Sequence, residues 1–253
     1  MDFSVFLSYN LLPWQWIAWF AFGLCIGLAK AGFGGLASFT LPIIALIFTA
    51  RAAIGLVLPV FIFADILAVL YYRRHAQWKY ILKLLPWTLT GFATALLVDR
   101  LIPVQAFKYL MGSSIIVGLL VMVWNDRRGK DKPPPSSWWF SALFGTAGGF
   151  SSMVSNAAGS LIAVFLLSMR LPKNHYVGTT AWFFLINNVI KLPIYIFVWK
   201  VVNVQTILFD LTLVPLIVAG AVLGIFLVKK IPELLFRKLI MILTLFSTIL
   251  LFI

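Results

Sequence analysis

The chain has 253 residues, of which 62% are hydrophobic and only 11% are charged. A soluble domain of this length would carry about a quarter charged residues, so the composition excludes a water-soluble globular protein, a disordered chain and a disulfide scaffold. The formal net charge is +13, but the basic residues stand in short loops between apolar runs, which indicates membrane topology rather than nucleic-acid binding. No Lys or Arg precedes Lys30, so we expect no cleavable signal peptide.

Long apolar runs along the chain predict membrane-spanning helices. The run VLPVFIFADILAVLYY is hydrophobic on every face, whereas a membrane β-barrel needs alternating polar and apolar residues. The polar stretch NDRRGKDKPPPSS contains three consecutive prolines, which forbid a continuous helix and mark a linker between two halves. We expect apolar segments at residues 11–30, 36–50, 52–72, 84–100 and 104–125, and then at 138–150, 156–170, 176–199, 208–228 and 234–253.

The two halves resemble each other, which indicates a duplicated unit. Five segments are an odd number, so the second copy enters the membrane upside down, as in many secondary transporters. The sequence therefore predicts an all-α membrane protein, a polytopic helical bundle of two inverted repeats. Residues 1–125 form the first transmembrane repeat, 126–137 a cytoplasmic linker and 138–253 the second repeat. The matching positions are FGLCIG at 22–27 with FGTAGG at 144–149, Gly55 with Gly178, and Pro86 and Gly91 with Pro215 and Gly220.

The distribution of basic residues predicts the orientation of the chain. With strictly alternating segments, fourteen Lys and Arg residues fall in loops on one side of the membrane and four on the other. Loops rich in Lys and Arg stay in the cytoplasm. We therefore expect a multi-pass protein of the cell (inner) membrane with both termini extracytoplasmic and the linker inside.

Two stretches rich in glycine and serine predict interruptions of the helices. They read KAGFGGLAS from residue 30 and GGFSSMVSNAAGS from residue 148. The adjoining segments 36–50, 138–150 and 156–170 are too short to cross a bilayer alone. We interpret each pair of segments as a hairpin of broken or re-entrant helices, because exposed backbone at membrane depth is tolerated only where it is buried in protein or lines a cavity.

Such interruptions place donors where an anion needs them. Helix N-termini offer unpaired N–H groups and a partial positive charge, and broken helices place these ends at mid-membrane. The alternative interpretation is that small residues only permit close helix packing. The candidate donors are the backbones of Gly32, Gly34 and Gly35 and the side chains of Ser151, Ser152, Ser155 and Asn156.

Lys30 is the most pointed candidate for binding an anion. It follows Trp19, which belongs to an expected interfacial aromatic belt, by eleven residues. At 1.5 Å per residue this is about 16 Å, roughly half the bilayer thickness. The alternative is that the helix spans the membrane fully and Lys30 extends to the cytoplasmic surface.

Four polar residues lie inside the third segments, namely Asp65, Asn187, Asn188 and Lys191. The alignment of the repeats makes Asp65 and Asn188 near-equivalent. An ionisable group inside the membrane suggests function, so Lys191 is a candidate substrate ligand and Asp65 a candidate carrier of a coupling proton. The alternative is a structural, inert ion pair between Asp65 and Lys191.

The glycine-rich first hairpin, its repetition after the central linker and the Pro/Gly-marked fourth segment of each half resemble the TauE/SafE family. These sulfite/organosulfonate permeases are also called TSUP transporters, and the resemblance covers nearly the whole chain. It implies movement of small sulfur-containing anions such as sulfite or organosulfonates. The chain departs from the usual pattern in Lys30, which precedes the first glycine cluster, and in a second cluster richer in serine than in glycine.

These observations favour a secondary transporter that moves a small anion by alternating access, as the inverted halves rock around the hairpins. A carboxylate or other small-anion permease, or a channel, is the alternative. We expect no enzyme, because the apolar segments hold no histidine and no pair of carboxylates. We expect no cofactor, no metal and no nucleic acid. Because no P-loop motif occurs, an ion gradient, with the proton as a candidate ion, is expected to drive transport.

Overall fold

The computed structural model describes residues 9, 11–37, 44, 47–48, 50–98 and 137–252. Within these residues every regular element is helical, which confirms the all-α prediction. The helices are α2 (Pro13–Lys30), α4 (Ala50–Tyr72), α5 (Trp78–Val98), α7 (Trp138–Ser155), α8 (Gly159–Ser168), α9 (Lys173–Pro193), α10 (Val204–Asp210), α11 (Val214–Lys230) and α12 (Glu233–Phe252). Short turns of 3-10 or π-helix continue several of them: η1 (Gly34–Leu36), η2 (Arg73–His75), η3 (Ile194–Val198) and η4 (Leu211–Leu213).

The helix bounds follow the apolar segments, with two clear differences. The segment expected at 138–150 continues to Ser155 as α7, so it has 18 residues and is not as short as predicted. The segment expected from residue 84 begins at Trp78, because the two lysines of its first turns depress the local hydropathy while Ile81 and Leu84 still face the core. The predicted segment 104–125, most of 36–50 and nearly all of the linker 126–137 lie outside the described residues.

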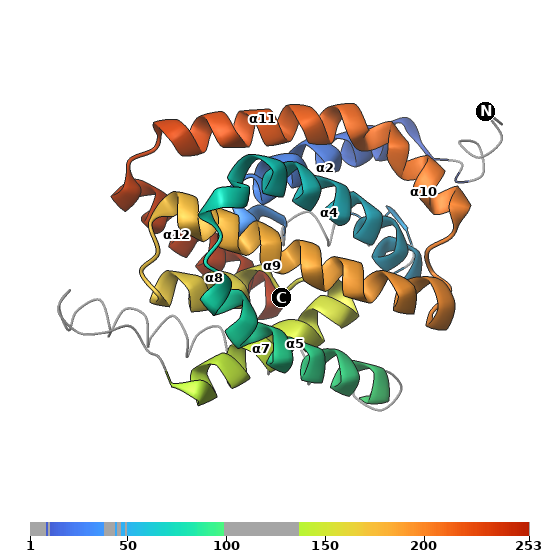
Figure 1. Ribbon diagram of the computed structural model, residues 1–253. Helices are drawn as coiled ribbons and strands as arrows, with labels where there is room; N and C mark the ends of the chain where they lie inside the picture. Colours follow the sequence, from blue (N-terminus) through green and yellow to red (C-terminus); the bar gives the residue numbers. More distant parts are fainter. Residues whose placement is uncertain are drawn as a thin grey trace.

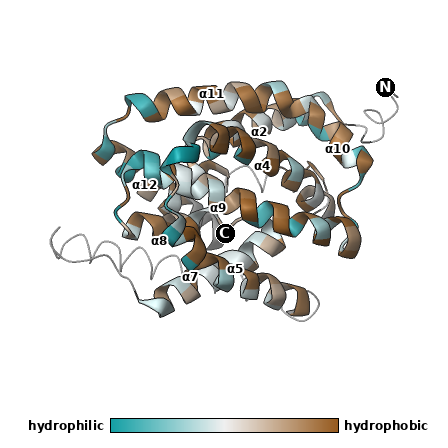
Figure 2. Ribbon diagram, in the orientation of Figure 1, coloured by the Kyte–Doolittle hydropathy of each residue, from teal (hydrophilic) through white to brown (hydrophobic). Residues whose placement is uncertain are grey.

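The structure has the length and surface of a membrane protein. Among the described residues, four helical stretches are long and apolar enough to cross a bilayer: Ala52–His75, Trp78–Leu97, Lys173–Val198 and Val204–Lys230. Large apolar side chains on these helices are exposed, among them Leu70, Leu97 and Val222. Hydrophobic residues extend along most of α11 (Figure 2). Lipid contact removes the cost of exposing such residues, so we describe the chain as a polytopic membrane protein.

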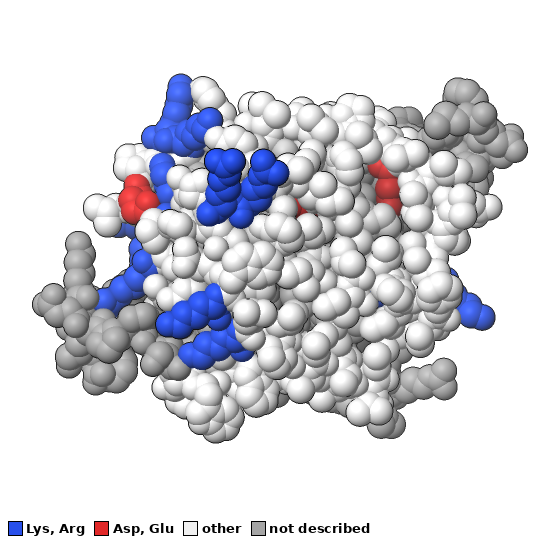
Figure 3. All heavy atoms as spheres, in the orientation of Figure 1, with Lys and Arg blue, Asp and Glu red and all other residues white. Residues whose placement is uncertain are grey.

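Basic residues collect at one end of the bundle. The visible face shows Lys and Arg gathered at one side of a broad uncharged surface (Figure 3). There the end of α11 meets the start of α9, because Lys173 Nζ donates to the backbone oxygens of Val228 and Ile231 at 2.8 and 2.7 Å. Two of the loops predicted to face the cytoplasm, the one before α9 and the one after α11, therefore lie side by side.

Three packed pairs of helices form the bundle (Figure 1). α2 packs along α11 on one edge, α5 packs along α7 on the opposite edge, and α4 packs along α9 between them. In the two outer pairs, the glycines that match between the halves lie against the backbone of the partner helix. A Cβ atom added to any of them would collide with that backbone, so these helices approach each other as closely as glycine allows. The colliding pairs are Gly27 with Ile217, Gly220 with Leu24, Gly149 with Thr88 and Gly91 with Thr146.

These contacts obey a two-fold relation between the halves. The first helix of each half packs on the fourth apolar segment of the other half, through glycines that the repeat alignment makes equivalent. The central helices α4 and α9 are equivalent too, and they run antiparallel: Gly55 lies against Val201 and Gly178 against Tyr72. Equivalent helices in opposite directions are what inverted repeats require.

We expect Gly27→Ala to destabilise the protein and Gly34→Ala to leave its stability nearly unchanged. The new methyl group at residue 27 would collide with the backbone oxygen of Ile217, whereas nothing lies within 4 Å of a Cβ at residue 34. Overpacking of this kind costs about 1–3 kcal/mol, while a substitution into open space changes stability by about 0.5 kcal/mol or less. Thermal unfolding in detergent measures both, and equal midpoints would contradict the close packing of α2 on α11.

The short helix α8 lies inside the bundle. Its ten residues span about 15 Å, half of the roughly 30 Å hydrocarbon core. All residues from Ser160 to Ser168 are buried, so protein rather than lipid surrounds this helix. Its length agrees with the short second segment of a hairpin of broken or re-entrant helices that the sequence predicts for the second half.

Candidate functional site

The first helix ends at a lysine buried within the protein. α2 stops at Lys30, and Gly32 follows with a φ of 157°, a conformation that L side chains rarely adopt. A Cβ on Gly32 would also collide with the side chain of Val228. Only 9% of Lys30 is exposed, so the alternative in which Lys30 reaches the membrane surface is wrong.

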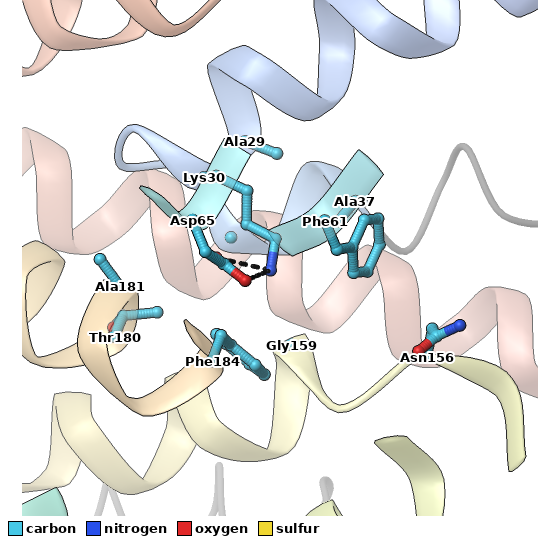
Figure 4. A pocket seen from close by; sticks show the side chains of 11 residues that line it. Ala29, Lys30, Ala37, Phe61, Asp65, Asn156, Gly159, Thr180, Ala181 and Phe184 are labelled. Carbon is cyan, nitrogen blue, oxygen red and sulfur yellow. Dashed lines mark hydrogen bonds and ion pairs between the residues drawn. The ribbon is translucent and has the colours of Figure 1, made fainter. Parts of the chain in front are cut away.

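Lys30 forms an ion pair with Asp65 of α4 (Figure 4). Its Nζ lies 2.9 Å from Oδ1 and 3.1 Å from Oδ2 of this fully buried carboxylate. The rings of Phe61 and Phe184 flank the ammonium, with centroids 4.4 and 4.5 Å from Nζ, and their π faces favour a cation. From α9, Asn188 Nδ2 donates to Asp65 Oδ2 at 2.7 Å.

The second predicted interruption separates α7 from α8. α7 ends at Ser155, and Asn156 takes the left-handed conformation with a φ of 56°. Its N–H donates to the oxygen of Ser152 at 3.1 Å, which closes the last turn. α8 starts afresh at Gly159, so its first N–H groups have no partner within the helix.

Lys191 of α9 binds the end of α7. Its Nζ donates to the backbone oxygen of Ser152 at 3.0 Å, to Ser152 Oγ at 2.9 Å and to Asn156 Oδ1 at 2.7 Å. These three bonds use all the protons of a fully buried ammonium, and the negative end of the α7 dipole favours its charge. The suggested ion pair between Asp65 and Lys191 is therefore wrong, because Asp65 pairs with Lys30.

A small cavity lies where the two interruptions meet. The centre of a water molecule has about 20 Å³ of room in it, which is enough for about one water. Four of the predicted site residues line it: Lys30, Gly34, Asp65 and Asn156. The lining is completed by Ala29, Ala37, Phe61, Gly159, Thr180, Ala181 and Phe184.

The buried charges around the cavity do not cancel. Lys30 and Lys191 contribute two positive charges and Asp65 one negative charge, which leaves one net positive charge. A buried region with an excess cation attracts anions, since the low dielectric strengthens the interaction. Because Asp65 already neutralises Lys30, however, an anion cannot take Lys30 while this ion pair persists.

One family has a sequence model that matches the chain, and it is described as sulfite exporter TauE/SafE. The match extends over residues 19–251. The chain belongs to the TauE/SafE family. No curated protein and no solved structure matches the chain.

TauE/SafE membership confirms the resemblance drawn from the hairpins and the linker. The family is one of membrane transporters, which agrees with the expectation that the protein is not an enzyme. It also agrees with the apolar helices, so the protein is a membrane transporter of the sulfite-exporter type.

The other predicted site residues of this TauE/SafE protein lie around the cavity, outside its lining. Ser155 Oγ donates to Ser151 O at 3.1 Å within α7, and Asn187 Nδ2 donates to Phe183 O at 2.7 Å within α9. Thr179 and Thr180 are not among the predicted site residues; both donate to their own helix, at 2.6 and 2.8 Å, and Thr180 lines the cavity. The remaining predicted residues lie close by. Gly32 follows the end of α2 and Gly35 belongs to the turn η1. Lys191 donates to Ser152 at the end of α7, and Asn188 donates to Asp65.

Sequence reasoning missed the two phenylalanines that flank the Lys30 ammonium. Phe61 and Phe184 are two of 23 phenylalanines, and their hydrophobicity alone does not separate them from lipid-facing ones. Their spacing to polar residues does: Phe184 lies four residues before Asn188, and Phe61 four before Asp65. Residues four apart share one face of a helix, so the equivalent positions Asp65 and Asn188 predict equivalent neighbours.

Proposed function

We propose that the protein is a secondary transporter that carries small sulfur-containing anions, such as sulfite or organosulfonates, by alternating access across the cell (inner) membrane. The observation that carries this proposal is the ammonium of Lys30, buried at the end of an interrupted helix and lining a small cavity. The TauE/SafE match supports the class of substrate.

An anion that leaves water needs new partners for its charge and its oxygens. Lys30 offers an ammonium, and α8 begins at Gly159 in the cavity wall, so the positive end of its dipole lies at the cavity. Asn156 adds an amide on the same cavity. An oxyanion with several oxygens matches this set better than a single-atom ion does, because its oxygens accept from several directions.

The small cavity favours a carrier over a channel. Its space for about one water is too small for a sulfonate, so the cavity expands when substrate binds. In an expanded cavity, donors that now lie outside its lining come within reach as further candidate ligands. They are Gly32, Gly35, Ser151, Ser152, Ser155, Asn187, Asn188 and Lys191. A channel instead needs a continuous open path.

The two-fold relation supports alternating access. Inverted repeats have two equivalent arrangements, in which the halves exchange conformations and the site opens to opposite sides. We place the basic end of the bundle in the cytoplasm and both termini outside the cytoplasm, since cytoplasmic loops carry the excess of Lys and Arg.

Counterflow in liposomes tests this function. Purified protein is reconstituted with unlabelled sulfite inside, and labelled sulfite, methanesulfonate and acetate are offered outside in turn. We expect saturable, transient accumulation of the two sulfur anions and little of acetate. Preference for acetate would instead support a carboxylate permease, and flux that never saturates would support a channel.

A further inference from the structure

Asp65 holds the position at Lys30 that a substrate anion needs. Both of its oxygens lie within about 3 Å of the Lys30 ammonium, at 2.9 and 3.1 Å. The carboxylate lines the same cavity as Lys30. It is therefore a tethered anion that competes with any free anion for this cation.

A change in the charge of Asp65 resolves this competition. If the carboxylate stayed ionised beside a bound anion, two negative charges would compete for the Lys30 ammonium, because the protons of Lys191 already bind Ser152 and Asn156, and like charges at close range in a low dielectric repel strongly. A protonated Asp65 carries no charge and releases Lys30. The hydrogen bond from Asn188 Nδ2 to Oδ2 can persist, because the oxygen of a carboxylic acid still accepts.

We propose that Asp65 binds the coupling proton, and that the anion replaces the Asp65 carboxylate at Lys30 each time this proton is taken up. This rests on the proposed function of anion transport. Asp65 accepts one proton from water on the open side, Lys30 stays an ammonium, and the anion becomes its ion partner. One proton and one monoanion then cross together, and on the other side the anion leaves, Asp65 releases the proton and the ion pair with Lys30 forms again.

The charge and the hydrogen bonds of Lys191 stay the same throughout this exchange. Its three bonds to Ser152 and Asn156 do not involve Asp65, so they survive the exchange. Lys30, Lys191 and ionised Asp65 sum to one positive charge, and so do Lys30, Lys191, neutral Asp65 and a monoanion. The bundle therefore buries the same net charge with and without substrate. The desolvation free energy of closing the site is then similar for the empty and the loaded transporter.

The groups that act on Asp65 are few. Among the described residues, the charged side chains that act on it are Lys30 from α2 and Lys191 from α9. The two histidines lie elsewhere, at the basic end, where His175 Nδ1 is 2.8 Å from His75 O. Histidine is the residue type most often responsible for pH responses near neutrality, so these two residues provide the control.

Methanesulfonate exchange in liposomes tests the proposal, because this probe stays ionised from acidic to alkaline pH. For the wild type we expect equal-pH exchange to rise as the pH falls, and an inward proton gradient to drive accumulation. Asp65→Asn resembles protonated Asp65, so we expect its exchange to vary less than about twofold over the same pH range. We expect the gradient to drive no accumulation by this variant. The double variant His75→Gln/His175→Gln is expected to behave like the wild type.

The outcomes separate the two proposals. Gradient-driven accumulation by Asp65→Asn, or loss of pH dependence in the histidine variant alone, would overturn Asp65 as the proton site while leaving anion transport standing. Wild-type exchange that does not respond to pH would do the same. Absence of methanesulfonate and sulfite exchange in the wild type would remove the proposed function itself. If Asp65→Asn is folded but exchanges nothing, the proposal that the anion replaces the Asp65 carboxylate at Lys30 is wrong.

Discussion

Lys30→Met is expected to destabilise the protein by about 3–5 kcal/mol, whereas Lys30→Met/Asp65→Asn recovers most of that loss. The single change leaves the buried carboxylate of Asp65 without the cation that lies 2.9 Å away. The double change removes both charges, and Asn188 can still donate to the new amide oxygen. Unfolding of the detergent-solubilised variants measures the coupling between the two residues.

The matched control is Lys200→Met, which removes an exposed lysine. It is expected to change stability by about 0.5 kcal/mol or less. If Lys30→Met were as stable as this control, or the double variant no more stable than the single one, the ion pair would not be a feature of the folded protein.

Anion affinity is expected to fall about ten- to a hundredfold in the folded double variant Lys30→Met/Asp65→Asn. Losing a hydrogen bond to a charged group costs about 1.5–3 kcal/mol, and each 1.4 kcal/mol is a tenfold change. The half-saturating sulfite concentration for counterflow, measured at equal amounts of reconstituted protein, reports the loss. Lys200→Met is again expected to match the wild type, and unchanged kinetics in the double variant would exclude Lys30 as a ligand.

Much of this arrangement could be predicted from local sequence. Glycine at residue 32 ends α2, and the serine-rich stretch before Asn156 ends α7, because these residues weaken helices wherever they occur. The paired motifs around Gly27 and Gly149 predicted equivalent helices, and the structure packs both glycines on the other half. The interruption in the second half falls at residues 156–158, in the later part of the predicted stretch rather than among its first serines.

The partner of Asp65 could not be predicted from the sequence. Lys30 and Lys191 are both buried lysines within reach of the centre, and the choice between them depends on how α2, α4 and α9 cross. α9 turns Asn188 toward Asp65, and Lys191, three residues later, points to the end of α7 instead. Packing of distant helices decides such contacts, and segment-by-segment reading contains no information about it.

The ion pair also changes the meaning of the site. Taken alone, Lys30 suggests a permanently available anion ligand. Its pairing with Asp65 makes the cation available only when the carboxylate is neutralised, so substrate binding and proton binding become one event. The excess charge of Lys191 then determines the sign of the site without itself lining the cavity.

The central claim is that the anion binds to Lys30 in the cavity between the two helix interruptions. An experimental structure with bound selenite, the selenium analogue of sulfite, tests it most directly, because anomalous scattering locates the selenium. The account predicts selenium beside Lys30 Nζ, near Asn156 and Gly159, with Asp65 no longer paired to Lys30. Selenium bound elsewhere in the protein, with the Lys30–Asp65 pair intact, would contradict it.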